Sequence, residues 1–225
     1  MEKKVLQIEK QLFDIQQKAL RLQMNPHFIF NSLNSIQSYI LSNDVDLAVN
    51  YLGRFSQLMR LILSNSRESV VPLADELKAI RHYLEIEKLR FEEKFTYSII
   101  VDAAIDDEFT GVPPMIIQPY VENAIIHGLI HKSTPGHITI RFQEKKSSLL
   151  CSIEDNGVGR AKASEIKRQS GLNTKSRGMM ITKERLEILN KKTDEKFSIN
   201  VIDLKDVKGK PCGTRVELLI SLQEL

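Results

Sequence analysis

The spacing of the apolar residues changes once along the chain, near residue 95, and this change limits the fold classes open to it. Before residue 95 the apolar residues recur every three or four positions, which indicates amphipathic helices. Beyond it, short stretches alternate apolar and polar residues, beginning with FTYSIIVD at residues 95–102, which indicates strands. This order of elements predicts an α+β chain in which one sheet is backed by a few helices.

Composition favours a globular protein of two units. The 225 residues are 42% apolar and 27% charged, and the net charge of +3 is too small to favour a nucleic acid partner. The two cysteines, Cys151 and Cys212, suit a reducing compartment, so we expect a cytoplasmic location. No stretch is long enough to span a membrane, so we expect no membrane insertion by this chain. A start within a helix also fits the cytoplasmic portion of an inner-membrane sensor that is anchored upstream.

Residues 1–70 are predicted to form dimerisation helices. A heptad-like seam in residues 1–24 favours a parallel coiled coil over a surface helix; it consists of Val5, Ile8, Leu12, Ile15, Ala19 and Leu22. After the turn SNDVD the same spacing returns in Val45, Ala48, Leu52, Phe55, Met59 and Ile62. A helical hairpin is too thin to bury both stripes, so we expect it to dimerise into a four-helix bundle.

A linker helix over about residues 73–92 is predicted to begin the second unit, residues 71–225. Its apolar face consists of Leu73, Leu77, Ile80 and Leu84. We expect Glu87 and Arg90, three positions apart, to form an exposed or rim ion pair on this helix.

Between the two seams lies the stretch QMNPHFIFNSLN, with a single histidine, His27. Asn25 suits a helix cap and Pro26 a first helical position, so a helix is predicted to start at Pro26. His27, Asn31, Asn34 and Ser38 then share a polar stripe, opposite Ile29, Leu33, Ile36 and Ile40. A histidine in a first helical turn is kept neutral by the helix dipole and can carry a phosphoryl group. The alternative is a capping or surface residue.

Three short motifs in the second unit suggest a nucleotide site. In QPYVENAIIHG, on a helix predicted over residues 114–130, Asn123 can offer an oxygen to Mg²⁺, and Glu122 can act through a water. In DNGVG, at the end of a strand, Asp155 can accept from an exocyclic amine, and Gly157 and Gly159 let the backbone approach a planar ring. Gly178 opens a helix after a loop predicted at 157–176, where free N–H groups suit phosphates. Gly213 and Thr214 complete the set.

These residues resemble a known family. ENA(x)₂HG, DNGxG, GMMITKERL and the final GT resemble the nucleotide site of the GHKL ATPases, the Bergerat fold. NPHFIFNSLNSI resembles the phosphoacceptor motif of LytS-like sensor histidine kinases, and PPMIIQPYVENAIIHGL is similar to their Asn box. The resemblance covers about residues 17–222.

The resemblance implies a homodimeric kinase core that uses ATP and Mg²⁺, phosphorylates His27 and passes the phosphoryl group to a response regulator receiver domain. The predicted catalytic residues are His27, Asn31, which would orient the nucleophile, and Glu122. The predicted nucleotide-binding residues are Asn123, which is also the metal ligand, His127, Asp155, Gly157, Gly159, Arg177, Gly178 and Thr214.

Two departures from the family pattern keep other functions open. Ile126 stands where the family often has a lysine, so His127, His131 or Lys132 would have to replace a phosphate contact. The expected GxGLxN lid pattern is replaced by Ser176, Arg177, Gly178 and Ile181, so Arg177 or Lys175 would hold a phosphate. One alternative is a nucleotide-binding dimeric adaptor without phosphotransfer. Another is a GHKL-type ATPase, against which His27 and Pro119, at the position of a water-activating glutamate, both argue.

Overall fold

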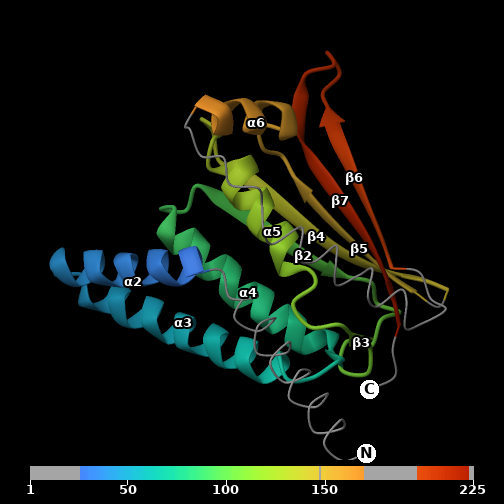
Figure 1. Ribbon diagram of the computed structural model, residues 1–225, viewed down its shortest axis with the longest axis horizontal. Helices are drawn as coiled ribbons and strands as arrows, with labels where there is room; N and C mark the ends of the chain where they lie inside the picture. The colour runs from blue at the N-terminus through green and yellow to red at the C-terminus, as the bar shows by residue number, and fades with distance from the viewer. Residues whose placement is uncertain (1–25, 147, 170–196, 223–225) are drawn as a thin grey trace, which may run out of the picture. The chain divides into compact units, whose positions relative to one another are not determined.

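The computed structural model describes residues 26–146, 148–169 and 197–222 (Figure 1). The chain divides into two compact units, Met1–Leu52 and Gly53–Leu225. The predicted coiled coil of residues 1–24, the capping role of Asn25 and the predicted helix of residues 179–190 lie outside the described residues. The functional boundary at residue 70 stays a prediction.

The predicted helical hairpin begins in the first unit, and its second helix continues past Leu52. Helix α2 spans Pro26–Leu41, and α3 begins at Val45 and continues to Asn65. Asp44 caps α3, because its Oδ1 accepts the backbone N–H of Leu47 at 3.2 Å. Tyr51 of α3 is fully buried, with its hydroxyl 3.4 Å from Ser32 Oγ on α2. The hairpin therefore closes around a tyrosine rather than around aliphatic residues alone.

The buried faces of the hairpin differ from the predicted ones. The buried residues of α2 include Phe28, Ser32 and Ile36, and those of α3 include Ala48, Tyr51, Leu58 and Ile62. Four residues of the predicted stripes are about half exposed or more, namely Leu33 (49%), Ile40 (60%), Val45 (59%) and Leu52 (48%). Spacing alone selected Leu52, whereas the larger Tyr51 beside it takes the interior position, where it also contacts the ring of Tyr39 at 5.9 Å.

The second unit is organised on a five-stranded sheet, which confirms the α+β prediction (Figure 1). The strands lie in the order β2-β4-β5-β7-β6; β2 and β4 are parallel and the other pairs antiparallel. Their bounds are Phe95–Val101 (β2), Gly136–Lys145 (β4), Ser148–Asp155 (β5), Pro211–Ser221 (β7) and Ser198–Lys205 (β6). Strand β2 falls within the predicted stretch 95–102, and the other four strands follow it along the chain, beyond residue 95, where alternation predicts strands.

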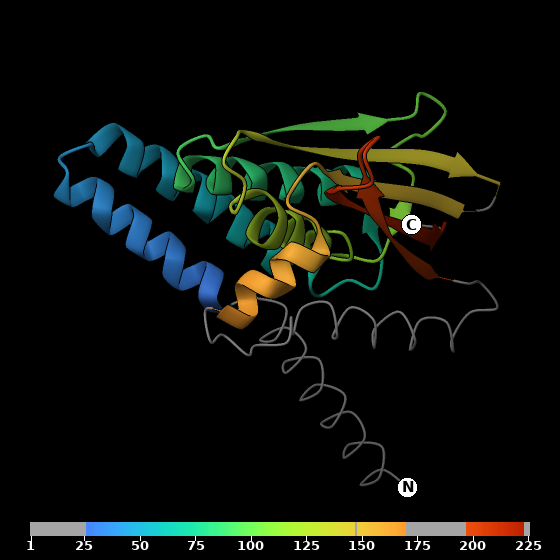
Figure 2. The ribbon, with the colours of Figure 1, turned by 90° about the horizontal axis from the view of Figure 1, so that it is seen from above.

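Helices cover one face of this sheet (Figures 1 and 2). They are α4 (Leu73–Arg90), α5 (Gln118–Asn123) and the π-helix η1 (Ala124–Leu129) that continues α5. Burial alternates along β4 and β5, so one residue in two faces these helices. The covered row includes Ile138, Ile140 and Phe142 of β4 and Leu149, Cys151 and Ile153 of β5. The other face carries polar residues such as Thr139, Arg141 and Ser152, together with Leu150.

Helix α4 enters this core from a short two-stranded sheet. Strand β1 (Val71–Pro72) pairs with β3 (Gly111–Val112), immediately before α4 begins. The first two N–H groups of the helix donate to carbonyls of the loop before β3, those of Asp107 and Thr110. The predicted apolar face of α4 is buried as expected. None of the described helices is long and apolar enough to cross a membrane.

The ion pair on α4 forms, but its predicted exposed or rim position is wrong for Glu87. Arg90 Nη2 lies 2.6 Å from Glu87 Oε2, but the Glu87 side chain is fully buried. The reason is that α4 is buried around most of its circumference, since its buried residues include Ala74, Leu77 and Ile86 on different faces. Burial raises the pKa of Glu87 to about 7, against the opposing effect of Arg90.

Two predicted boundaries are also wrong. The helix predicted over 114–130 begins only at Gln118, because Pro113 and Pro114 disfavour helical backbone before them and Met115 takes a left-handed φ of 57°. Within the predicted loop at 157–176, residues Arg160–Gln169 form helix α6. This segment has few apolar residues and hence little periodicity, but its Ala, Lys, Glu, Arg and Gln residues all favour helix.

Candidate functional site

Asp155 occupies the last position of the buried row on β5. It follows Leu149, Cys151 and Ile153 at steps of two, so strand geometry turns its carboxylate to the helix-covered face. Only 4% of the residue is exposed. Across the sheet it pairs with Ile138 on β4 and Thr214 on β7. A carboxylate is thereby held at the edge of an apolar core.

Two backbone N–H groups accompany this buried carboxylate. Gly157 donates to Asp155 Oδ1 at 2.8 Å, and Thr214 also donates from its backbone. Burial nevertheless raises the pKa of Asp155 to about 6, because loss of hydration outweighs these hydrogen bonds. At neutral pH the group is an ionised acceptor in a poorly hydrated place, which suits recognition of a ligand N–H group.

Two glycines lie close to the Asp155 carboxylate. A Cβ added at Gly128, on η1, would lie 2.9 Å from Asp155 Oδ1, and one at Gly157 would lie 2.7 Å from the same atom. The DNGVG loop is also bonded to η1, because Val158 donates its N–H to the carbonyl of Gly128 at 3.2 Å. Backbone alone therefore surrounds the carboxylate on this side, and a larger residue at either position would displace it.

Gly213 and Gly159 hold the ends of the strands that carry the site. Gly213 has a φ of 144°, and a Cβ there would lie 1.9 Å from the carbonyl oxygen of Asp155. Gly159 has a φ of 78°, and its Cβ would lie 2.9 Å from Cβ of Pro211. Both positions therefore require glycine for conformation and for space.

We expect Gly213→Ala to destabilise the protein by about 2 kcal/mol or more, because it combines a rare φ with a collision against backbone. Gly209 is the matched control: its φ is 76°, but nothing lies within 4 Å of an added Cβ. Gly209→Ala should cost only about 1 kcal/mol, the conformational part. Urea unfolding of the two variants measures the difference, and equal midpoints would refute the proposed collision.

The helix that carries Asn123 changes its winding at the site. α5 ends at Asn123, and η1 follows with a π-type bond from the N–H of Ile130 to the carbonyl of Ile125 at 3.1 Å. Such π turns are frequent at functional sites. The side-chain amide of Asn123 donates its N–H to the carbonyl of Pro119. The other polar atom of this side chain is an amide oxygen, a kind of ligand that Mg²⁺ accepts.

His127 lies one turn after Asn123 and is half buried. Its pKa is lowered, first by burial and then by the charges of Lys167 on α6 and of His131. The imidazole is therefore neutral at physiological pH and can donate or accept one hydrogen bond at each nitrogen. The positive charge of Lys167 therefore acts on His127, the residue after Ile126.

The sequence does not predict helix α6, and it therefore does not predict that Lys167 lies on a helix near the site. α6 packs against η1 and β7, and its first residue, Arg160, forms two hydrogen bonds with Asp203 of β6, at 2.6 and 2.7 Å. Gly128 was also absent from the predicted site residues, although it lies within the ENAIIHG motif. Apolar periodicity could not predict a role for Lys167, whereas the ENAIIHG motif could have identified Gly128 as a site residue.

The other predicted site residues fall into three groups. Glu122 is half buried on α5, and its charge helps to raise the pKa of Glu87 on α4. His27 and Asn31 lie on α2, in the other unit. Arg177 and Gly178 lie outside the described residues. No cluster of three potential metal-ligating His, Cys, Asp or Glu residues occurs among the described residues. Asn123 stays a predicted Mg²⁺ ligand.

Comparison with known proteins identifies relatives over most of the chain. The histidine kinase family model matches residues 15–95. The sensor protein LytS of Oceanobacillus iheyensis is 38% identical over 152 residues, which cover 68% of this chain and 26% of that protein. An uncharacterised sensor-like histidine kinase of Staphylococcus epidermidis is 36% identical over 153 residues, 68% of this chain and 29% of that protein.

Among solved structures, the histidine kinase domain of the Erythrobacter litoralis EL346 blue-light activated histidine kinase aligns with a TM-score of 0.47. The identity is 15%, over 92% of this chain and 95% of that one. The chain spans about a quarter of the length of the curated LytS relatives that it matches.

Proposed function

This chain belongs to the histidine kinase family and is LytS-like, and from this we propose that it is the kinase core of a two-component sensor. In this proposal the core binds ATP, transfers the γ-phosphoryl group to His27 and then to an aspartate of a response regulator. It acts in the cytoplasm, as a cytoplasmic protein or as the cytoplasmic portion of an inner-membrane sensor.

The observation that supports nucleotide binding most directly is the environment of Asp155. Its buried carboxylate can accept a hydrogen bond from the exocyclic amine of adenine, and the close approach of Gly128 and Gly157 holds that carboxylate in place. Gly159 and Thr214 hold the ends of the same loop and strand. His127 and Lys167 can meet the phosphates from η1 and α6, together with Arg177 and Gly178.

In the proposed reaction, one imidazole nitrogen of His27 attacks the γ-phosphorus of ATP, the bond to the bridging oxygen breaks, and ADP leaves. The attacking nitrogen must carry a lone pair, so the proton has to stay on the other nitrogen. Asn31 lies one turn further along α2. Its amide oxygen would accept a hydrogen bond from the protonated nitrogen and so orient the ring. Bound Mg²⁺ would neutralise phosphate charge. Asn123 would hold it, with Glu122 acting through a water.

We propose that the chain is a homodimer formed through residues 1–70. The exposed apolar side chains of the first unit support this, since a second copy can cover Leu33, Ile40, Val45 and Leu52. Replacing Leu33 and Ile40 by glutamate places like charges on such an interface, and we expect a monomer by sedimentation at micromolar concentration. A native chain that sediments as a monomer under the same conditions would contradict the dimer.

Incubation with γ-labelled ATP and Mg²⁺ tests the whole proposal. Kinase activity predicts a labelled protein whose label is lost in acid and retained in alkali, as for phosphohistidine. The absence of label with intact ATP binding would favour the nucleotide-binding adaptor. Release of labelled phosphate into solution, with no labelled protein at any time, would favour the GHKL-type ATPase.

A further inference from the structure

Glu76 is a buried acid in the first turn of α4 that the proposed reaction does not use. Only 1% of the residue is exposed. A buried carboxylate loses much hydration free energy, and hydrogen bonds must compensate for that loss. The hydrogen-bond partners of Glu76 therefore indicate its role.

The partners of Glu76 are backbone N–H groups of a segment far away in sequence. Glu76 Oε2 accepts the N–H of Met115 at 2.8 Å, and Oε1 accepts the N–H of Ile117 at 3.4 Å. One side chain therefore binds two alternate residues of the same segment. Hydrogen bonds to a charged acceptor are stronger than those between neutral groups.

The segment bound by Glu76 has no regular structure of its own. Residues 113–117 are all buried and lie between β3 and α5. Pro113 and Pro114 have no N–H group, and Met115 takes a left-handed φ of 57°. A buried, non-helical backbone needs partners for its N–H groups, and the carboxylate of Glu76 supplies two.

The start of α5 follows this segment directly. Gln118 is the first residue of α5, Asn123 is its last, and His127 lies on η1 beyond it. The position of Ile117 therefore fixes the position and direction of the helix that presents Asn123. At the other end of the segment, the β1–β3 pairing ties Val112 to Val71, just before α4. Both ends of the segment are thus held to the start of α4.

We propose that Glu76 is a positioning residue of the nucleotide site: its carboxylate fixes the start of α5 relative to α4, and so places Asn123 and His127. This inference rests on the proposed function, because it assumes that Asn123 and His127 contact the bound nucleotide. Displacements of about 1 Å at such groups are enough to weaken a reaction by about two orders of magnitude.

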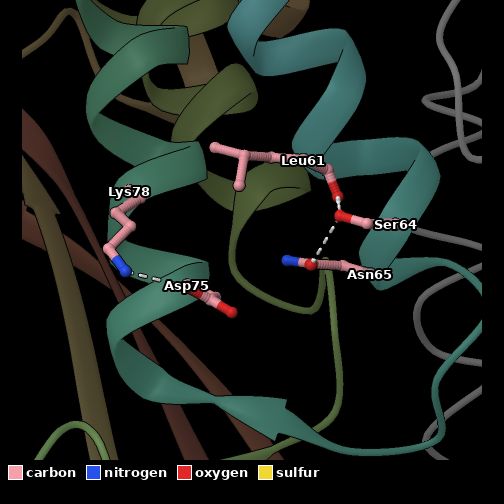
Figure 3. Close-up of polar contacts among 5 residues, drawn as sticks. All are labelled: Leu61, Ser64, Asn65, Asp75 and Lys78. Atoms are coloured by element: carbon pink, nitrogen blue, oxygen red, sulfur yellow. Dashed lines mark hydrogen bonds and ion pairs between the residues drawn. The ribbon is translucent and has the colours of Figure 1, made fainter.

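The test compares Glu76→Gln with Asp75→Asn. Glutamine keeps the size of the side chain but turns an amide N–H toward one of the two backbone N–H groups. Asp75, the preceding residue, faces Lys78 instead, with Oδ1 3.0 Å from Nζ (Figure 3). Asp75→Asn therefore removes the same charge from the same helical turn without touching the segment.

We expect Glu76→Gln to weaken binding of a non-hydrolysable ATP analogue by about tenfold, through displacement of Asn123. Amide exchange at Met115 and Ile117 should rise in the same variant. Asp75→Asn should leave both quantities near native values, and autophosphorylation by Glu76→Gln should recover at saturating ATP. Native affinity in a folded Glu76→Gln protein, or an equal loss in Asp75→Asn, would overturn the proposal.

Two further measurements separate the possible failures. If the native chain binds no ATP analogue, the proposed function fails, whereas the exchange rates of Met115 and Ile117 still test the hydrogen bonds. If Glu76→Gln does not fold, amide hydrogen exchange measured on the native chain tests the proposal instead. Amides of Met115 and Ile117 that exchange much faster than those of α4 would refute the proposal.

Discussion

Asp155→Asn is expected to abolish measurable ATP binding while the protein remains folded. The buried carboxylate offers only acceptors to an adenine amine, whereas an asparagine amide can place its own N–H group against that amine. Asparagine has nearly the same size, and its oxygen can still accept the N–H of Gly157. Because burial of the charge already raises the pKa of Asp155 to about 6, a neutral side chain should not destabilise the ligand-free protein at pH 7.5.

Calorimetric titration with an ATP analogue, together with thermal unfolding, checks this prediction. Glu154→Gln is the matched control: it removes a carboxylate from the adjacent residue, which faces the other side of the sheet and pairs with Arg215 at 2.7 Å. That variant should bind ATP normally. Native affinity in Asp155→Asn with normal melting would remove Asp155 from the site.

The same carboxylate predicts a pH dependence of opposite sign for stability and for binding. The pKa of Asp155 rises from 3.8 to about 6 on folding, so the folded chain binds more protons between these values. The contribution of this group to stability therefore falls as pH rises from about 4 to about 6. ATP affinity should instead fall as pH drops below about 6, because a protonated carboxyl accepts more weakly. This affinity loss should be absent from any residual binding by Asp155→Asn.

The position of Asp155 could be predicted from the sequence because strand alternation is a local property. In LLCSIED every second residue is buried, so the alternation alone puts Asp155 at the end of the buried row. The glycines were likewise visible, since DNGVG and the final GT mark places where backbone must come close. Elements with strong local patterns therefore lie where the sequence predicts them.

The missed features depend on contacts between distant residues. Glu87 looks exposed on a helical wheel, but α4 is buried around most of its circumference. Met115 could not be predicted to leave the helix, because its left-handed backbone depends in part on Glu76, 39 positions earlier. Tyr51 takes the interior position instead of Leu52, because its ring packs against Tyr39 and its hydroxyl donates to Ser32. These features depend on contacts with residues distant in the sequence, about which periodicity and propensity carry no information.

His27→Gln is expected to take up no acid-labile label from γ-labelled ATP, with ATP affinity unchanged. His27 lies on α2, in the first unit, whereas Asp155, Asn123 and His127 belong to the second, so the substitution should spare the nucleotide site. Glutamine is similar in size but has no nitrogen lone pair that can attack phosphorus. Label uptake with parallel calorimetry measures the two activities separately.

Two further variants make this prediction specific to the phosphoacceptor. His82→Gln, on α4, is the matched control; His82 has a lowered pKa because it is partly buried and near Arg54, and its replacement should leave label uptake intact. Asn31→Leu should slow uptake by about 100-fold if Asn31 fixes the tautomer of His27, whereas Asn31→Asp should preserve or raise the rate, because a carboxylate accepts more strongly. Undiminished label in His27→Gln would assign the phosphoryl group to another residue. Equal uptake by Asn31→Leu and the native chain would leave His27 as acceptor and remove Asn31 from the reaction.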